Sequence, residues 1–258
     1  MRLSEALPLG DRELVAFVGA GGKKTAMGRL AAEGTERGYD VGYTTTTRMP
    51  PPPDLPLTVA DVEASPYAVA EDEPPAAFAA SWVADPERVD RKVEGFDPDA
   101  LDDFFARGIF DWLVVKADGA RRREFKAPGP DEPAVPDRAT HVVPVASVAA
   151  VGDLLDEATV HRPERVAAIT DLAVGDAITP EAVGAVLASP DGGLKGAPDA
   201  ATVTPVVNKA DTPERRETAR AVLDHAIGRT DRFDRGLVTS FERDVCLPVE
   251  GRPSRRRA

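Results

Sequence analysis

The sequence predicts a single α/β domain of three layers, in which a mostly parallel sheet lies between helices. An apolar run without alternation at residues 13–18 is typical of a strand buried on both faces. A helical pattern at 23–37 and a second apolar run at 41–45 follow it and complete a βαβ unit. Apolar runs at 112–115 and 141–145 add further buried strands. Such units build a parallel sheet with helices on both faces.

The first unit is well defined along the chain. Within the predicted helix, Met27, Leu30 and Ala31 lie at helical spacing, and Gly38 ends the helix. The proline run at residues 50–53 ends the unit after its second strand.

Residues 54–95 read as a peripheral insertion made of short strands and an acidic surface loop at 71–75. A helix is predicted at 98–107, with Asp97 as its N-cap. The chain at 120–138 is rich in arginine and proline and reads as a loop.

The C-terminal half continues the α/β pattern. Pro205 argues against a fully paired strand at 203–207, because proline has no N–H to donate. The domain is predicted to span residues 1–251 and to be followed by a basic, disordered tail at 252–258. Its other predicted elements are helices at 163–170, 180–188 and 213–228, a flexible loop at 191–196 and a last strand at 237–239.

Composition narrows the class of protein. A chain of 258 residues with 42% hydrophobic content can bury a sizeable core. The N-terminus has no signal-peptide pattern, and no apolar run approaches the roughly 18 residues that a membrane span needs. The single cysteine, Cys246, excludes an internal disulfide and a multi-cysteine metal site. We therefore expect a soluble, cytoplasmic protein with no membrane partner.

The net charge of the chain argues against nucleic acid as a partner. The net charge is −12, from 44 acidic and 32 basic residues, which is unfavourable for a nucleic-acid-binding surface. The basic side consists of 25 arginines and only seven lysines. An acidic, lysine-poor composition is typical of a chain adapted to high salt, so we expect a halophilic protein.

A glycine- and lysine-rich loop follows the first strand. Gly19, Gly21 and Gly22 allow the loop to turn its N–H groups toward a phosphate at a helix N-terminus. Lys23 adds a point charge against that phosphate. This context predicts a P-loop NTPase-like, more narrowly SIMIBI-like, nucleotide-binding fold. The alternative is a glycine turn at a helix start that binds no ligand.

The spacing of this loop affects which residue is expected to bind Mg²⁺. The position six before Lys23 is Phe17, so the loop fits a shorter variant with glycines four and one before the lysine. In that variant a Ser or Thr after the lysine holds Mg²⁺, but here that residue is Lys24. We expect either that Thr25 binds the metal one position later or that the metal site is altered.

Polar side chains end two further strands. Asp118 follows the strand at 112–115, where a carboxylate can hold Mg²⁺, although an Asp-Gly turn is the simpler alternative. The threonines at 44–47 end the second strand, so their hydroxyls are placed to meet a metal, a γ-phosphate or an attacking water. Ordinary β-propensity explains them equally well. The candidate catalytic residues are Lys23, Asp118 and Thr46, and the candidate metal ligands are Thr25 and Asp118.

A second motif, Asn208-Lys209-Ala210-Asp211, follows the strand at 203–207. In Asn-Lys-x-Asp loops the carboxylate accepts hydrogen bonds from guanine N1–H and the exocyclic amine, and adenine offers no matching donors. With the glycine loop, this motif predicts GTP as the nucleotide. The candidate nucleotide-binding residues are Gly19, Gly21, Gly22, Lys23, Lys24, Thr25, Asn208, Lys209 and Asp211.

Other kinds of site find little support. The three histidines, His141, His161 and His225, are far apart and lack metal-ligand spacing, and His161 is expected to be structural. No Ser-His-Asp or Cys-His arrangement is indicated.

Nine short stretches occur in an order that resembles the YqeC-type proteins, a family described as accessory proteins of selenium-dependent molybdenum hydroxylases. The resemblance covers about residues 13–228, most of the chain. Its most distinctive parts are His161-Arg162-Pro163-Glu164 and the Gly-Gly-Leu-Lys-Gly stretch. The stretches are 18–23, 44–47, 117–120, 126–128, 132–136, 160–164, 178–181, 192–196 and 208–211.

The resemblance implies a nucleotide-binding protein that helps to mature or insert a cofactor, with hydrolysis as a timing step. Its implied partners are a molybdenum hydroxylase or the proteins that mature its cofactor. Two departures weaken the expected Mg²⁺ site. Lys24 stands where the family usually has Ser or Thr, and Lys116 stands where it commonly has glutamate.

Three functions remain open from the sequence. The first is a GTP-binding accessory protein that is a slow GTPase. The second is a small-molecule kinase or nucleotidyltransferase, in which Arg121-Arg122-Arg123 and Lys126 hold an anionic second substrate such as a pterin phosphate. The third is a scaffold that binds nucleotide without hydrolysing it.

Overall fold

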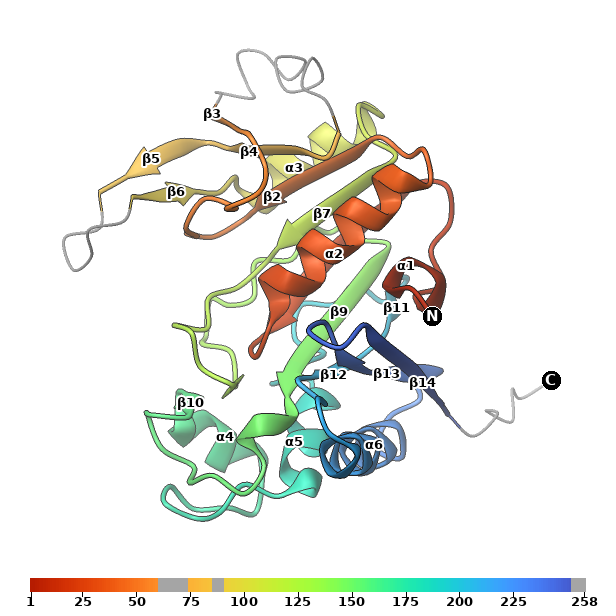
Figure 1. Ribbon diagram of the computed structural model, residues 1–258. Coiled ribbons are helices and arrows are strands. Elements are labelled where there is room, and N and C mark those ends of the chain that lie inside the picture. Colours follow the sequence, from red (N-terminus) through yellow and green to blue (C-terminus); the bar gives the residue numbers. More distant parts are fainter. Residues whose placement is uncertain (60–73, 85–90, 252–258) are drawn as a thin grey trace.

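The structure, a computed structural model that describes residues 1–59, 74–84 and 91–251, is built around a ten-stranded sheet (Figure 1). Every pairing in this sheet is parallel except that of the last two strands. Across the sheet the order is β14 (Val245–Glu250), β13 (Arg235–Ser240), β12 (Val206–Asn208), β9 (His141–Ser147), β1 (Glu13–Gly19), β7 (Trp112–Lys116), β2 (Val41–Thr45), β4 (Ala76–Ala79) and β3 (Leu57–Val59), with β11 (Thr202–Val203) paired to β9.

Helices cover both faces of the sheet and produce three layers. Alternate residues of β1 separate the two cores: Val15 and Phe17 pack in one buried cluster, and Ala16 and Val18 pack in the other. The Phe17 cluster contains side chains of α1 (Leu3–Ala6) and α2 (Lys23–Glu36). The other contains side chains of α3 (Pro98–Ala106), α4 (Pro163–Ile169), α5 (Pro180–Leu187) and α6 (Pro213–Ile227).

The chain order across the sheet places the polar loops at one edge. From β1 the chain passes through α2 to β2, and β7 later inserts between these two strands. β9 and β12 then extend the sheet on the other side of β1. Because these strands are parallel, their carboxyl ends lie at the same edge, where ligands of open α/β sheets bind.

Smaller elements lie outside the main sheet. The strands β5 (Ser81–Val83) and β6 (Lys92–Glu94) form an antiparallel ribbon that extends away from the sheet beyond β4 (Figure 1). The short strands β8 (Phe125–Lys126) and β10 (Val160–His161) pair with each other, and the 3-10 turn η1 (Val148–Ala150) follows β9. No helix among the described residues is long and apolar enough to span a membrane.

The structure confirms the predicted three-layer α/β fold and its buried strands and helices. The predicted strand at 203–207 breaks at Thr204 and Pro205 into β11 and β12, for the reason that its proline indicated. The predicted insertion contains β4, which is wholly buried and pairs with β2. Its acidic residues 71–73 lie outside the described part of the chain, as does the predicted tail at 252–258.

The structure refines two sequence predictions and adds two elements. Asp97 occupies the N-cap position of α3, as predicted, although its side chain accepts no hydrogen bond from that helix. The loop predicted to be flexible at 191–196 is a series of turns, closed against α5 by the bond from Gly193 N–H to the Val186 carbonyl (2.8 Å). The strand β14 and the short helix α1 were not predicted.

Candidate functional site

The glycine loop is shaped by backbone that needs glycine. Gly19, Gly21 and Gly22 have φ values of 94°, 75° and 124°. A Cβ on Gly21 would lie 2.5 Å from the Ser147 nitrogen, and a Cβ on Gly22 would lie 2.2 Å from Nδ2 of Asn208. Gly22 is also the N-cap of α2 and has no capping side chain, so the first N–H groups of the helix have no side-chain acceptor. Within the loop, Gly19, Ala20 and Gly21 donate their N–H groups to Asp118 Oδ2 and to the carbonyls of Val145 and Arg123.

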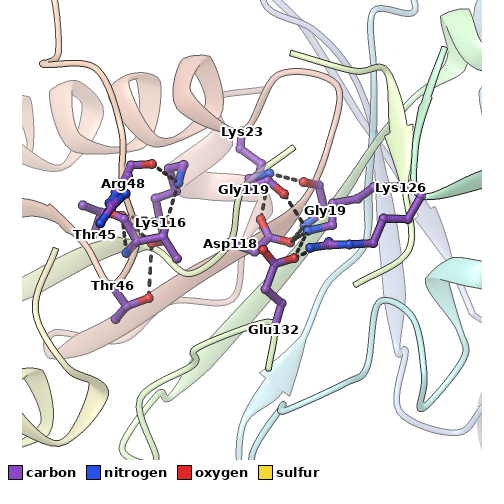
Figure 2. A network of polar contacts seen from close by, with 12 residues as sticks. Gly19, Lys23, Thr45, Thr46, Arg48, Lys116, Asp118, Gly119, Lys126 and Glu132 are labelled. Carbon is purple, nitrogen blue, oxygen red and sulfur yellow. Dashed lines mark hydrogen bonds and ion pairs between the residues drawn. The ribbon is translucent and has the colours of Figure 1, made fainter. Parts of the chain in front are cut away.

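Asp118 lies between two buried lysines next to this loop (Figure 2). Its Oδ2 accepts a hydrogen bond from Gly19 N–H (2.8 Å) and lies 3.0 Å from Nζ of Lys126. Its Oδ1 lies 2.8 Å from Nζ of Lys23, an ion pair whose angle leaves Oδ1 without a well-directed hydrogen bond. Burial raises the pKa of Asp118, but the charges of Lys23 and Lys126 outweigh it and keep the carboxylate ionised.

The cluster continues from Lys126 to the protein surface. Lys126 donates to the Gly119 carbonyl (2.6 Å) and to Oε2 of Glu132 (2.9 Å), and Arg162 donates to the same oxygen (2.7 Å). Burial raises the pKa of Glu132, but the Arg162 hydrogen bond and the Lys126 charge outweigh it and bring the pKa to about 2. Glu132 thus holds two cations in place beside the loop.

Lys116 belongs to a separate group of contacts beside the first (Figure 2). The side chain is buried, and its Nζ donates to Oγ1 of Thr47 (2.5 Å) and to the Arg48 carbonyl (3.2 Å). Both acceptors are neutral. Burial, followed by the charge of Lys23, lowers the pKa of Lys116 to about 7.

The threonine hydroxyls at the end of β2 all have protein partners. Thr44 donates to the Phe78 carbonyl (2.8 Å), and Thr45 donates to the Lys116 carbonyl (2.8 Å). Thr46, the predicted catalytic residue, donates to the Ala134 carbonyl (2.7 Å). These bonds fasten the loop after β2 to β7 and to the segment that follows Glu132.

The Asn-Lys-x-Asp loop contacts the glycine loop directly. Nδ2 of Asn208 donates to the Gly21 carbonyl (3.1 Å), and its Oδ1 accepts from Oγ1 of Thr239 (3.1 Å). Lys209, at φ 64°, forms an ion pair with Glu124 (2.6 Å). The two sequence motifs therefore form one structural unit.

Asp211 has a partner that the sequence reasoning missed. Its Oδ1 accepts a hydrogen bond from Oγ of Ser240 (2.5 Å), and its Oδ2 makes a long contact with Nη1 of Arg215 (3.4 Å). Ser240 ends β13 at the same edge of the sheet. The rule that singled out Asp118, a polar residue at the carboxyl end of a strand, would also have found Ser240.

Comparison with known proteins identifies the family of this chain. The family model described as YqeC protein matches residues 15–164. The chain is also 31% identical over 188 residues to the "Uncharacterized protein YqeC" of Escherichia coli (strain K12), covering 72% of this chain and 71% of that relative. The chain belongs to the YqeC family. No solved structure matches it.

The part of the chain that the YqeC model matches contains the glycine loop, Lys116, Asp118 and the Lys126–Glu132–Arg162 group. The Asn208–Asp211 loop lies beyond it, although the Asn208 side chain contacts the glycine loop. The structure thus brings together residues from both parts of this YqeC-family chain.

The side chains around Asp118 do not fit a Mg²⁺ ion held by the protein. Both carboxylate oxygens already lie within 3.0 Å of a lysine nitrogen. Thr25 and Lys24 are exposed on the first turn of α2. Across residues 1–59, 74–84 and 91–251, no group of three His, Cys, Asp or Glu side chains is placed to hold a metal. The predicted ligation of Mg²⁺ by Thr25 and Asp118 stays a prediction.

The cavity beside Asp118 is small as well. A cavity of about 20 Å³, lined by Gly19, Asp118, Lys126 and Gly192 among others, has room for about one water molecule. His161 lies in this region, and burial, with the charges of Arg162 and Lys126, lowers its pKa to about 4. The imidazole is therefore neutral near pH 7.

Proposed function

We propose that the protein binds a nucleoside triphosphate, with a preference for GTP, at the carboxyl edge of its central sheet. One observation carries the proposal. The Asn208 amide bonds to the Gly21 carbonyl on one side and to the Thr239 hydroxyl on the other, so it joins the phosphate-type loop to the base-reading loop. This contact brings the two motifs together at the edge of the sheet, as a single nucleotide site would require.

The phosphate half of the proposed site is supported by charge. In a chain of net charge −12, three lysines are buried at this edge, namely Lys23, Lys116 and Lys126. Asp118 already lies between Lys23 and Lys126, whereas Lys116 has no carboxylate partner among the described residues, so a bound anion would relieve the repulsion between Lys116 and Lys23. The N–H groups at the start of α2 point to the same ligand chemistry, a polyphosphate.

The base half of the proposed site centres on Asp211. A carboxylate accepts hydrogen bonds from the two adjacent donors of guanine. The Ser240 hydroxyl donates a hydrogen bond to Oδ1 of Asp211 (2.5 Å) and so fixes the orientation of this carboxylate. The long contact to Arg215 is weak enough to be exchanged for a base. The Lys209 stem, held by Glu124, would pack along the ring.

The proposed role is that of a cytoplasmic accessory protein in the maturation of a selenium-dependent molybdenum hydroxylase, or in insertion of its cofactor, and it rests on the family resemblance. Lys23, Asp118 and Thr46 remain the proposed catalytic groups. Asp118 is bound to two lysines and Thr46 to the Ala134 carbonyl, so we expect any GTPase activity to be slow. In this proposal any Mg²⁺ at the site is brought by the nucleotide and is not held by protein side chains alone.

The test is a titration of fluorescent GTP and ATP analogues in saturating Mg²⁺. We expect wild type to bind GTP at least about tenfold more tightly than ATP, a difference of ~1.4 kcal/mol, and Asp211→Ala to lose that preference. Asp191→Ala, an exposed aspartate in a turn, is the matched control. Equal binding of both nucleotides, indifferent to Asp211, would remove the guanine assignment. Thermal shifts that stay flat across all nucleotides would remove nucleotide binding altogether.

A second candidate function, transfer to an anionic acceptor, is favoured by the turn after Asp118. Arg121 and Arg122 are exposed and have φ values of 46° and 62°, an unusual backbone for consecutive arginines. The charge of Arg122 acts on Lys24 at the start of α2. Phosphoryl or nucleotidyl transfer to an added acceptor would identify a kinase or nucleotidyltransferase. Binding without turnover at any Mg²⁺ concentration would identify a scaffold.

A further inference from the structure

Lys116 is a buried cation without a carboxylate partner among the described residues. Its side chain is only 6% exposed, and none of the ion pairs found in the described part of the chain includes it. The acceptors of its Nζ, the Thr47 hydroxyl and the Arg48 carbonyl, carry no charge. A buried amine held only by neutral groups gives up its proton readily, and an anion beside it would restore the charged form.

The position of Lys116 is on the α2 side of the sheet. It follows Trp112 and Val114 at two-residue intervals on β7, and both of these pack in the cluster that contains Met27 and Leu30 of α2. Lys116 is also in register with Phe17 on β1, two residues before Gly19. Its side chain therefore lies on the α2 side of the sheet, and its Nζ reaches the loop after β2 at Thr47 and Arg48.

The charges around this point are unbalanced. Lys23 exerts the strongest effect of any neighbouring charge on Lys116, and that effect is repulsive. Asp118 and Glu132 are the two carboxylates of the cluster, and they pair with three cations, namely Lys23, Lys126 and Arg162. Lys116 is a fourth basic group beside them and has no share in these pairs, so the surplus of positive charge lies beside the glycine loop.

We propose that Lys116 supplies the bound triphosphate with the positive charge that a divalent metal supplies in metal-dependent sites, so that binding does not require Mg²⁺. This inference rests on the proposed function. It also accounts for the poor fit of Mg²⁺ to this site, because the carboxylate that would hold the metal is already paired with Lys23 and Lys126. A fixed ammonium stabilises phosphate charge without needing a protein carboxylate to hold it.

The test compares binding in EDTA with binding in saturating Mg²⁺ at constant ionic strength. The probes are GTP and inorganic triphosphate, measured by calorimetry with wild type, Lys116→Met and Lys116→Glu. Lys92→Met, on the β5–β6 ribbon, is the matched control. We expect wild type and the control to bind both probes with dissociation constants that differ by less than about threefold between the two conditions. Lys116→Met should weaken binding in EDTA by about tenfold or more.

Lys116→Glu should bind only when Mg²⁺ is present, because a carboxylate there repels phosphate and attracts the metal. If wild type binds GTP only with Mg²⁺, the inference is overturned and the proposed function stands. If Lys116→Met binds in EDTA as wild type does, the inference is likewise overturned. If inorganic triphosphate binds in EDTA and no nucleotide does, the proposed function fails and the role of Lys116 stands. Wild type that binds neither probe contradicts both, and the wild-type comparison needs no variant to fold.

Discussion

Lys23 and Asp118 form a buried ion pair in which Nζ lies 2.8 Å from Oδ1. The two residues come from different strands' carboxyl ends, because Lys23 opens the helix after β1 and Asp118 follows β7. Lys126 takes the other oxygen of the same carboxylate at 3.0 Å. One aspartate is therefore the shared counter-ion of two buried lysines, and the glycine loop depends on it through the bond to Gly19 N–H.

Removing the charge of Asp118 is expected to destabilise the protein strongly. Asp118→Asn leaves Lys23 and Lys126 buried without their common counter-ion, which costs about 3–5 kcal/mol in the free energy of unfolding. Urea denaturation measures the loss, with Asp191→Asn as an exposed control. Because a bound polyanion would replace the missing charge, added inorganic triphosphate should raise the melting temperature more for the variant than for wild type. A loss below about 1 kcal/mol would contradict the arrangement.

Gly22 tests the contact between the two motif loops. In Gly22→Ala the new Cβ meets Nδ2 of Asn208 at 2.2 Å, and the residue must hold φ at 124°. We expect a loss of about 1–3 kcal/mol in stability together with weaker triphosphate binding. Gly28→Ala is the matched control, since its Cβ meets nothing within 4 Å and its helical position should gain about 0.5–1 kcal/mol. Adding Asn208→Ala should relieve part of the Gly22→Ala defect, and strictly additive losses would argue against the clash.

Patterning explains which elements were predicted. The strands around β1, β7 and β9 are continuous apolar runs because helices bury both of their faces, so their sequences alone define them. The strand β14 is different. It lies at the edge of the sheet, and Pro248, opposite Leu237, interrupts its short apolar run, because a proline argues against an ordinary paired strand. The four residues of α1 are too few for a periodic pattern.

The sequence predicted only part of the candidate site, because the partners of its charged side chains are distant in the sequence. Strand ends and glycines are local signals, and they located the glycine loop and Asp118. The partner of a charged side chain depends on residues far away in the sequence, such as Lys23 and Asp118 or Asp211 and Ser240. The sequence therefore indicated where Asp118 lies, while the structure shows that two lysines, rather than open space for a metal, surround it.

Glu132 should make the free energy of unfolding depend on pH. Its pKa is about 2 in the folded protein, below the ordinary value of 4.5 for a glutamate side chain. The stabilisation is therefore fully present above about pH 4.5, and it is lost as the pH falls toward 2, with a total on the order of 2–3 kcal/mol. Urea denaturation of wild type and Glu132→Gln between pH 7 and 2.5 measures it. The gap between the two proteins should shrink on acidification, whereas Glu157→Gln, on an exposed turn, should follow wild type throughout. A gap that stays constant would contradict this assignment.

Ser240 should matter for guanine recognition without touching the phosphates. Its hydroxyl donates to Oδ1 of Asp211 (2.5 Å) and so fixes the carboxylate that is proposed to read the base. In Ser240→Ala we expect GTP binding to weaken about five- to tenfold, the effect of one hydrogen bond to a charged group, with ATP binding nearly unchanged. Ser189→Ala, whose hydroxyl accepts from Asp191 N–H in a distant turn, is the control. Because Ser240 acts through Asp211, Ser240→Ala combined with Asp211→Ala should be no worse than Asp211→Ala alone. An equal loss for GTP and ATP in Ser240→Ala would instead mean that the serine supports the fold of this edge and not the choice of base.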